Sequence, residues 1–306
     1  MSDGLAGARL ARVRDDRGQV RVGVVAGDEL ELLTGDDMLA TLERGEPPAV
    51  VDRVPILDAE TLALPEPWRA LVPVVAPETW AAGVTYERSR EARRAESQGR
   101  DVYDLVYDAE RPELFFKDAA GRRTVGPGEP IAARSDASWT VPEPELAVVL
   151  GADAQPLALT IGNDVSSRDI EGANPLYLPQ AKIYARACAL GPVLLVPADW
   201  SATYEIELRI LDASGQPVFE DRTSTTSMCR SVSELTEFLR RDNPVPAGSV
   251  LLTGTGIVPT DEVTLAPGHR SRSASPGSAC SAIPWQRQAH RDHSHEASAD
   301  VAAGTS

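Results

Sequence analysis

The chain has 306 residues, 42% of them hydrophobic and 25% charged, and a formal net charge of −16. This is an ordinary globular composition, sufficient for one large or two modest domains. The negative charge disfavours nucleic-acid binding, which needs clustered Lys and Arg. No apolar run approaches the roughly 20 residues of a membrane helix. Three scattered cysteines and the lack of an apolar leader predict a cytoplasmic protein that does not span a membrane.

The first stretch of the chain, with RLARVRDDRGQVRVGVVAGDELELL, alternates Val and Leu with charged residues. A turn signal interrupts it at residues 15–18, so we expect short antiparallel strands in a small N-terminal α+β domain over residues 1–75. Prolines at positions 65, 67, 73 and 77 then break any regular pattern and predict a surface linker. A second domain is expected to begin near residue 76.

The following region combines one charged segment with many short apolar runs. Residues 86–111 are rich in Glu, Arg and Ala and predict a mostly exposed helical segment, either a solvated face or a mobile cover over a site. From 114 to 195 and from 205 to 257, β-branched runs between Gly, Pro and Asp predict strands. The stretch SVSELTEFLRR is an amphipathic helix capped by Ser231 or Ser233. The fold class is therefore mostly β with some α.

The composition changes abruptly after residue 268. The segment 269–306 has neither a strand nor a helix period, and it contains all four histidines of the protein. We expect this tail to be disordered, with the second domain limited to residues 76–268.

Two acids, Glu143 and Glu145, stand two apart in the strand-like run VPEPELAVVL. Period-two geometry places them on one face, where they repel each other unless a cation lies between them. A third acid, Asp164, follows a strand that ends at Gly162. An all-oxygen set without His or Cys suits Mg²⁺, with Mn²⁺ or Ca²⁺ as alternatives. The competing interpretation is that both glutamates pair with arginines on a solvated strand.

A set of short motifs occurs in the order found in the fumarylacetoacetate hydrolase superfamily, which the chain therefore resembles between about residues 78 and 260. The motifs are GVTY at 83–86, RPELFFK at 111–117, EPE at 143–145, GNDVSSRDIEG at 162–172, QAK at 180–182, GP at 191–192 and TGTG at 253–256. Each motif is weak alone, and the ordered set is specific.

This resemblance implies a catalytic domain built as a mixed β-roll and acting as a homodimer or higher homo-oligomer. It implies that Glu143, Glu145 and Asp164 hold the divalent metal, with Lys182 beside them. The substrate would be a small anionic 2-oxo acid. The loop of Thr253, Gly254, Thr255 and Gly256 is expected to bind the substrate carboxylate. Arg168, with Asp169 and Glu171, is expected to orient Asp164.

Hydrolases of the superfamily that cleave carbon–carbon bonds carry a His–Glu pair just after the tyrosine motif. The aligned positions here are Ser89 and Ala92, and no histidine precedes His269. The sequence is most similar to the branch that dehydrates 2-keto-3-deoxy-D-arabinonate, giving 2,5-dioxopentanoate. We therefore expect a metal-dependent dehydratase of a 2-keto-3-deoxy sugar acid. The alternatives are an acylpyruvate-type hydrolase and an inactive relative disabled by the altered C-terminus.

Dehydration needs one group that removes a proton at C3 and another that assists the departing hydroxide. We expect Lys182 to be the base, or the partner of the enolate, and Glu113 to act at the leaving hydroxyl. Arg88 and Arg90 are candidates to grip the substrate through forked hydrogen bonds.

Members of the superfamily continue after T-L-x-P-G with two further core strands and a G-I-G-x-L-x-N-P-V segment. Here the segment ASPGSACSAIPWQ stands instead. Codons for these residues, read one base earlier from the end of the Ala274 codon, can encode IAGIGVLSNPVA. A frameshift near residue 268 accounts for the tail, and the loss of two strands would expose a sheet edge.

Overall fold

The computed structural model describes residues 4–96, 106–274 and 281–284. Its first elements form an antiparallel meander in which each strand pairs with the next along the chain. They are β1 (Arg9–Arg14), β2 (Val20–Ala26), β3 (Glu29–Leu33), α1 (Met38–Arg44) and β4 (Val50–Pro55). The Asp15 carboxylate accepts hydrogen bonds from the backbone N–H groups of Arg17 and Gln19, which closes the expected turn. The strands expected at the N-terminus are thus confirmed.

The meander does not form a sheet of its own, because β1 pairs with β14 and so continues into a 13-stranded sheet. The main path of that sheet runs β4-β3-β2-β1-β14-β11-β10-β17-β6-β7. Its further members are β14 (Val193–Leu195), β11 (Pro156–Asp164), β10 (Pro144–Leu150), β17 (Val250–Leu252), β6 (Glu78–Gly83), β7 (Glu113–Ala119), β13 (Cys188–Leu190), β8 (Thr124–Val125) and β5 (Arg69–Ala70). The division at residue 75/76 stays a prediction.

Two smaller sheets complete the β structure. The strands β9 (Thr140–Val141) and β12 (Ser166–Ser167) form a two-stranded ladder. A four-stranded sheet contains β16 (Pro217–Ser224), β15 (Glu205–Leu211), β18 (Arg270–Ala274) and β19 (Ser281–Pro284) in that order. The last two strands differ from the disorder expected after residue 268. The free side of β15 offers unpaired backbone groups, and the chain at 270–274 pairs with them although its residues are polar.

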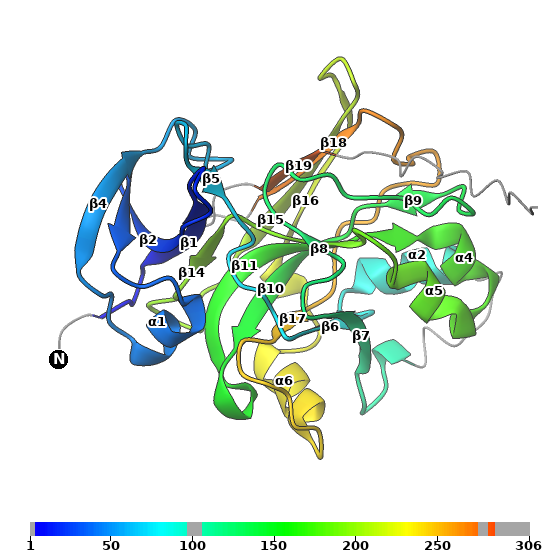
Figure 1. Ribbon diagram of the computed structural model, residues 1–306. Helices are drawn as coiled ribbons and strands as arrows, with labels where there is room; N and C mark the ends of the chain where they lie inside the picture. Colours follow the sequence, from blue (N-terminus) through cyan, green and yellow to red (C-terminus); the bar gives the residue numbers. More distant parts are fainter. Residues whose placement is uncertain (1–3, 97–105, 275–280, 285–306) are drawn as a thin grey trace, which may run out of the picture.

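The α-helices after the meander are short and lie mostly at the end of the molecule opposite β1–β4 (Figure 1). They are α2 (Glu87–Glu96), α4 (Arg168–Ala173), α5 (Leu178–Lys182) and α6 (Val232–Arg240), with 3-10 turns at Ala152–Ala154, Pro175–Tyr177 and Thr225–Ser227. Helix α6 begins as expected, because the Ser231 hydroxyl accepts the N–H of Glu234 at 3.1 Å. Helix α2 agrees with the charged segment, whose residues 97–105 lie outside the described part. No helix of the described chain has the length and apolar character needed to cross a membrane.

Strand β10 is the centre of the core. All seven of its residues are buried, and it pairs with β11 on one side and β17 on the other. Its alternate side chains enter two different hydrophobic clusters, Val148 in one and Val149 in the other. A strand buried on both faces reads as a continuous apolar run, which explains the sequence LAVVL. Any polar group placed at the end of this strand is therefore held in a dry, rigid setting.

Candidate metal centre

The three acids expected at the site come from the ends of two adjacent antiparallel strands. Glu143 immediately precedes β10, Glu145 lies within it, and Asp164 is the last residue of β11. The backbone N–H of Asp164 donates to the Glu143 carbonyl at 2.9 Å. The N–H of Glu143 donates to the Asn163 side-chain carbonyl at 3.0 Å. The backbone thus sets the three carboxylates beside one another before any side-chain contact is made.

The carboxylates form one buried cluster. One oxygen from each of Glu143, Glu145 and Asp164 lies within 4.8 Å of the other two, and the residues are only 1–2% exposed. The competing interpretation is wrong about a solvated strand, because β10 is enclosed on both faces, although Glu143 does pair with an arginine, Arg168. Glu143 and Glu145 therefore lie together, as the period of a strand predicts.

Buried cations balance part of this negative charge. The Lys182 ammonium lies 2.5 Å from Glu143 Oε2 and 3.0 Å from Asp164 Oδ2, and it donates to the Ser166 hydroxyl at 2.6 Å. The Arg168 guanidinium pairs with Glu143 Oε1 at 2.8 Å. Arg168 thus contacts Glu143, rather than Asp164 as expected from the sequence. Helix α4 begins at Arg168, whose guanidinium contacts Glu143 Oε1, while Lys182 contacts Oε2 of the same carboxylate.

Glu145 is the member of the cluster for which a cation is most needed. It accepts a hydrogen bond from the Gly254 N–H at 2.7 Å, and no ion pair of Glu145 occurs in the described chain. Burial raises the pKa of Glu145 well above its ordinary value, and repulsion from Asp164 and Glu143 adds to that shift. A hard dication among the three oxygens would remove both costs. The residues present therefore fit Mg²⁺, which prefers carboxylate ligands.

A hollow of about 20 Å³ adjoins the carboxylates. The residues that line it include the two proposed catalytic groups, Lys182 and Glu113. Glu113 faces Gly83 across the β6–β7 pair, and a Cβ at Gly83 would lie 2.5 Å from the Glu113 Cδ. Glycine at this position is therefore what leaves room for the Glu113 carboxylate beside the site. A hollow of this volume holds about one water, so a sugar acid needs it to widen.

Only part of the loop at 253–256 lies at the site. Gly254 and Thr255 line the hollow, and Gly254 has φ +90°, a conformation that favours glycine. Thr253 is fully buried, and its hydroxyl donates to the Leu146 carbonyl at 2.9 Å. Gly256 packs against the ring of Tyr86. Gly254 and Thr255 thus lie next to the carboxylates, whereas Thr253 and Gly256 do not line the hollow.

Neither Arg88 nor Arg90 of α2 lines the hollow. Arg88 pairs with Asp221 of β16 at 2.6 Å and is half exposed. Arg90 pairs with Glu87 at 3.0 Å, and its guanidinium stacks 4.4 Å above the Tyr107 ring. The substrate contacts expected of Arg88 and Arg90 stay a prediction that this geometry does not support.

Three further residues at the site had no assigned role in the sequence analysis. Ser89 is buried, lines the hollow and donates its hydroxyl to the Thr255 carbonyl. Phe115 lines the same hollow, and the Lys182 ammonium lies 5.7 Å from the centre of its ring. Lys117 is completely buried and pairs with Asp164. The motif RPELFFK contained the signal for Lys117, but its neighbours could not be read from the sequence.

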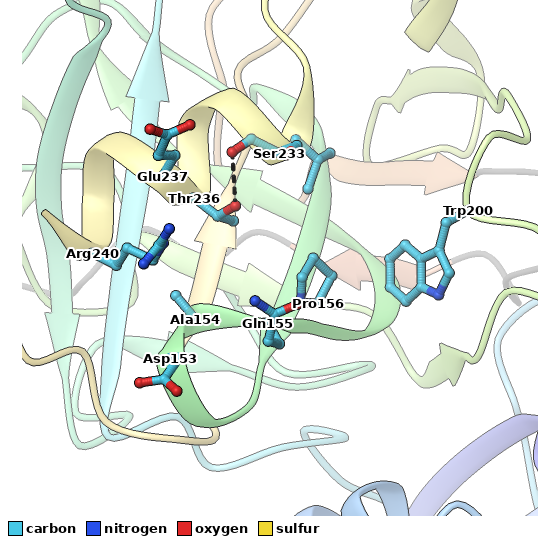
Figure 2. A pocket seen from close by; sticks show the side chains of 10 residues that line it. Asp153, Ala154, Gln155, Pro156, Trp200, Ser233, Thr236, Glu237 and Arg240 are labelled. Atoms are coloured by element: carbon cyan, nitrogen blue, oxygen red, sulfur yellow. Dashed lines mark hydrogen bonds between the residues drawn. The ribbon is translucent and has the colours of Figure 1, made fainter.

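A larger depression of about 380 Å³ lies on the surface between α6 and the 151–156 turn (Figure 2). Trp200 stands at one side of it and Arg240 at the other, and both side chains are exposed. The dashed line marks the hydrogen bond from the Thr236 hydroxyl to the Ser233 carbonyl, at 3.0 Å. The carboxylate cluster is not part of this depression, so we place the chemistry in the small buried hollow.

Comparison with known proteins agrees with this choice. Residues 79–282 match the family model described as fumarylacetoacetate (FAA) hydrolase C-terminal. A protein of Haloferax volcanii named probable 2-keto-3-deoxyxylonate dehydratase is 50% identical over 200 residues, which are 65% of this chain and 68% of that protein. The 2-dehydro-3-deoxy-D-arabinonate dehydratase of Saccharolobus solfataricus is 47% identical over 196 residues, covering 62% and 65% of the two chains.

A solved structure extends the likeness to the fold. The structure of a 2-keto-3-deoxy-D-arabinonate dehydratase complexed with magnesium and 2,5-dioxopentanoate superposes with a TM-score of 0.81 at 38% identity. The match covers 92% of this chain and all of that one. The mostly β fold with some α, expected from the sequence, is therefore confirmed.

Proposed function

The chain belongs to the fumarylacetoacetate hydrolase family, and from that premise we propose that it is a divalent-metal-dependent dehydratase of a 2-keto-3-deoxy sugar acid. The substrate is of the kind of 2-keto-3-deoxy-D-arabinonate, and the product is 2,5-dioxopentanoate. Relatives named as dehydratases of such acids, at 47% and 50% identity, support this choice. The observation that carries the proposal is the buried cluster of three carboxylates beside Lys182 and Glu113.

Glu143, Glu145 and Asp164 would hold the dication, with Mg²⁺ as the ion that fits them best. When bound, the ion polarises the 2-oxo group and the carboxylate of the substrate, and this acidifies C3. The ion would also attract the negatively charged substrate, which the chain as a whole, with its net charge of −16, repels.

The reaction removes one water. A proton leaves C3, hydroxide leaves C4, and proton transfer within the unsaturated product gives the 2,5-dioxo acid. We assign removal of the C3 proton to the neutral amine of Lys182, whose nitrogen lies beside Glu143, Asp164 and Ser166 and which becomes an ammonium in this step. Glu113, which also lines the hollow, protonates the departing hydroxyl in its acid form. Gly254 and Thr255 line the hollow and would contact the substrate, while the Gly254 N–H holds the Glu145 carboxylate.

Ser89 favours dehydration over hydrolysis. It occupies the position at which the resemblance expects the histidine of carbon–carbon hydrolases, and its side chain lines the hollow. A serine hydroxyl that donates to the Thr255 carbonyl is a poor general base for activating water. Hydrolysis of an acylpyruvate is the second candidate, and it would require another base in the site.

The experiment compares two substrates with the same purified protein and Mg²⁺. We expect 2-keto-3-deoxy-D-arabinonate to yield the semialdehyde product, measured by reductive trapping and mass spectrometry, and an acylpyruvate to yield no second acid. The reverse pattern would make the protein a hydrolase. Binding of Mg²⁺ without turnover of either compound would indicate an inactive relative. We also expect a homo-oligomer, which light scattering tests.

A further inference from the structure

Of the 30 basic residues in the chain only two are lysines, Lys117 and Lys182, and the others are arginines. Both lysines are buried, at 0% and 2% exposure, and both pair with the same carboxylate, that of Asp164. An ammonium is a compact point charge with three donors, whereas a guanidinium is a broad planar fork. The protein thus uses an ammonium only at the carboxylate cluster. Lys182 lines the hollow, and Lys117 does not.

Lys117 reaches the cluster from an irregular point in β7. In the β6–β7 ladder Asp118 lies opposite Thr79 and Phe116 lies opposite Trp80. Lys117 is therefore an extra residue, a β-bulge without a partner on β6. Bulges re-aim a side chain and are frequent beside active sites.

The ammonium of Lys117 has three acceptors, one for each of its protons. It pairs with Oδ1 of Asp164, and it donates to the backbone carbonyls of Lys182 at 2.5 Å and Val165 at 3.3 Å. The first contact holds the carboxylate at the end of β11, and the second holds the end of α5, from which the Lys182 amine projects. One buried charge therefore ties an expected metal ligand to the backbone of the expected base.

We propose that Lys117 is a positioning residue of the reaction, which fixes the Asp164 carboxylate as a metal ligand and the backbone of Lys182 as the support of its amine. This inference rests on the proposed function. Lys117 acts through these two groups and does not touch the substrate. A mere balance of charge is the competing role, and the two roles predict opposite effects on the metal.

The test replaces Lys117 with Met, which keeps most of the apolar stem and removes the charge and its three donors. If Lys117 only balanced charge, the variant would bind a dication more tightly, because the site becomes more negative. If Lys117 positions Asp164, the variant binds Mg²⁺ about 10-fold to 100-fold more weakly, the usual cost of losing a partner of a metal ligand. Calorimetric titration with Mg²⁺ alone shows whether the variant binds the ion more tightly or more weakly. Affinity that is unchanged or tighter overturns the proposal.

The second part of the test measures turnover. At saturating Mg²⁺ the Lys117→Met variant is expected to lose at least about 10-fold in kcat, with KM for the sugar acid changed by less than about 3-fold, because the amine of Lys182 is displaced. The matched control is Asp118→Asn on the same strand. Asp118 is equally buried, but its contacts are with Arg123 and Thr124. This control is expected to lose stability and to keep both Mg²⁺ affinity and kcat.

Two measurements remain decisive if the Met variant does not fold. Lys117→Gln keeps a donor for one carbonyl, and it too is expected to bind Mg²⁺ more weakly. Wild-type protein labelled with ¹⁵N-lysine gives only two ammonium signals in an NMR spectrum. The Lys117 signal is expected to stay protected from water exchange when Mg²⁺ is added, and its loss overturns the proposal. The Mg²⁺ titration and the NMR spectrum need no substrate, so they stand even if the proposed dehydratase activity fails.

Discussion

Gly83 offers a way to move the proposed acid without changing it. The Ala side chain in Gly83→Ala would place its Cβ 2.5 Å from the Glu113 Cδ, well inside the 3.4 Å of ordinary contact. The Glu113 carboxylate must therefore shift by about 1 Å, since β6 and β7 are held in register by their ladder. A misplacement of that size costs about 100-fold in rate, or about 2.7 kcal/mol of transition-state stabilisation.

The assay is kcat at saturating Mg²⁺ and substrate for Gly83→Ala, for Glu113→Gln and for the double variant. If Gly83→Ala acts only through Glu113, the double variant is no slower than Glu113→Gln alone. Gly151→Ala is the control, because its Cβ would meet the flexible end of Leu157 at 2.9 Å, outside the hollow. Full activity of Gly83→Ala, or losses that multiply in the double variant, would refute the assigned role of Glu113.

Three further predictions concern stability. The raised pKa of Glu145 means that the folded, metal-free protein holds this proton more tightly than the unfolded chain, so the contribution of Glu145 to stability is fully present below pH 4.5 and is lost as the pH rises through the folded pKa. Urea midpoints measured in EDTA between pH 4.5 and 8 should show this fall, and Glu145→Gln should flatten it. The hydroxyls of Ser271 and Ser273 are buried on β18 without a hydrogen-bond partner in the described chain. Replacing either with Val should raise the free energy of unfolding by about 1–2 kcal/mol, and a loss of stability would show that the hydroxyls have acceptors. Ser231→Ala removes the N-cap of α6 and should lower the free energy of unfolding by about 1 kcal/mol, again measured by urea unfolding. An unchanged midpoint would show that this cap does not stabilise the protein.

The sequence predicted those parts of the site that depend on local periodicity. Glu143 and Glu145 are two apart on a strand, and the apolar run after them predicted its burial. Asp164 could be added because it follows the end of another strand. The ordered motifs then placed Lys182 and Glu113 near these acids, and both line the hollow. Their catalytic roles stay predictions.

Contacts between segments far apart in the chain could not be predicted from the sequence. The contacts of Lys117 depend on a bulge in β7, and a bulge leaves no mark in a single sequence. Arg88 and Arg90 were chosen for their charge, but the face of α2 that they occupy is set by packing. The pairing of β1 with β14 likewise joins segments more than 180 residues apart in the sequence.

The C-terminal segment shows why a polar pattern misleads. Residues 270–273 alternate Arg with Ser, and their serines face the core where a strand normally places apolar side chains. Disorder was therefore the reasonable expectation, yet the backbone pairs with β15. Buried serines are also what a shifted reading frame would leave in a core strand. The frameshift, the cytoplasmic location and the oligomeric state stay predictions.

The central claim is that the three buried carboxylates hold the ion on which dehydration depends. The most direct measurement is turnover of 2-keto-3-deoxy-D-arabinonate as a function of Mg²⁺, with Glu143→Ala beside the wild type. The account predicts semialdehyde formation that EDTA abolishes, that added Mg²⁺ restores, and that the folded variant lacks. Turnover that survives EDTA, or that Glu143→Ala retains, would contradict it.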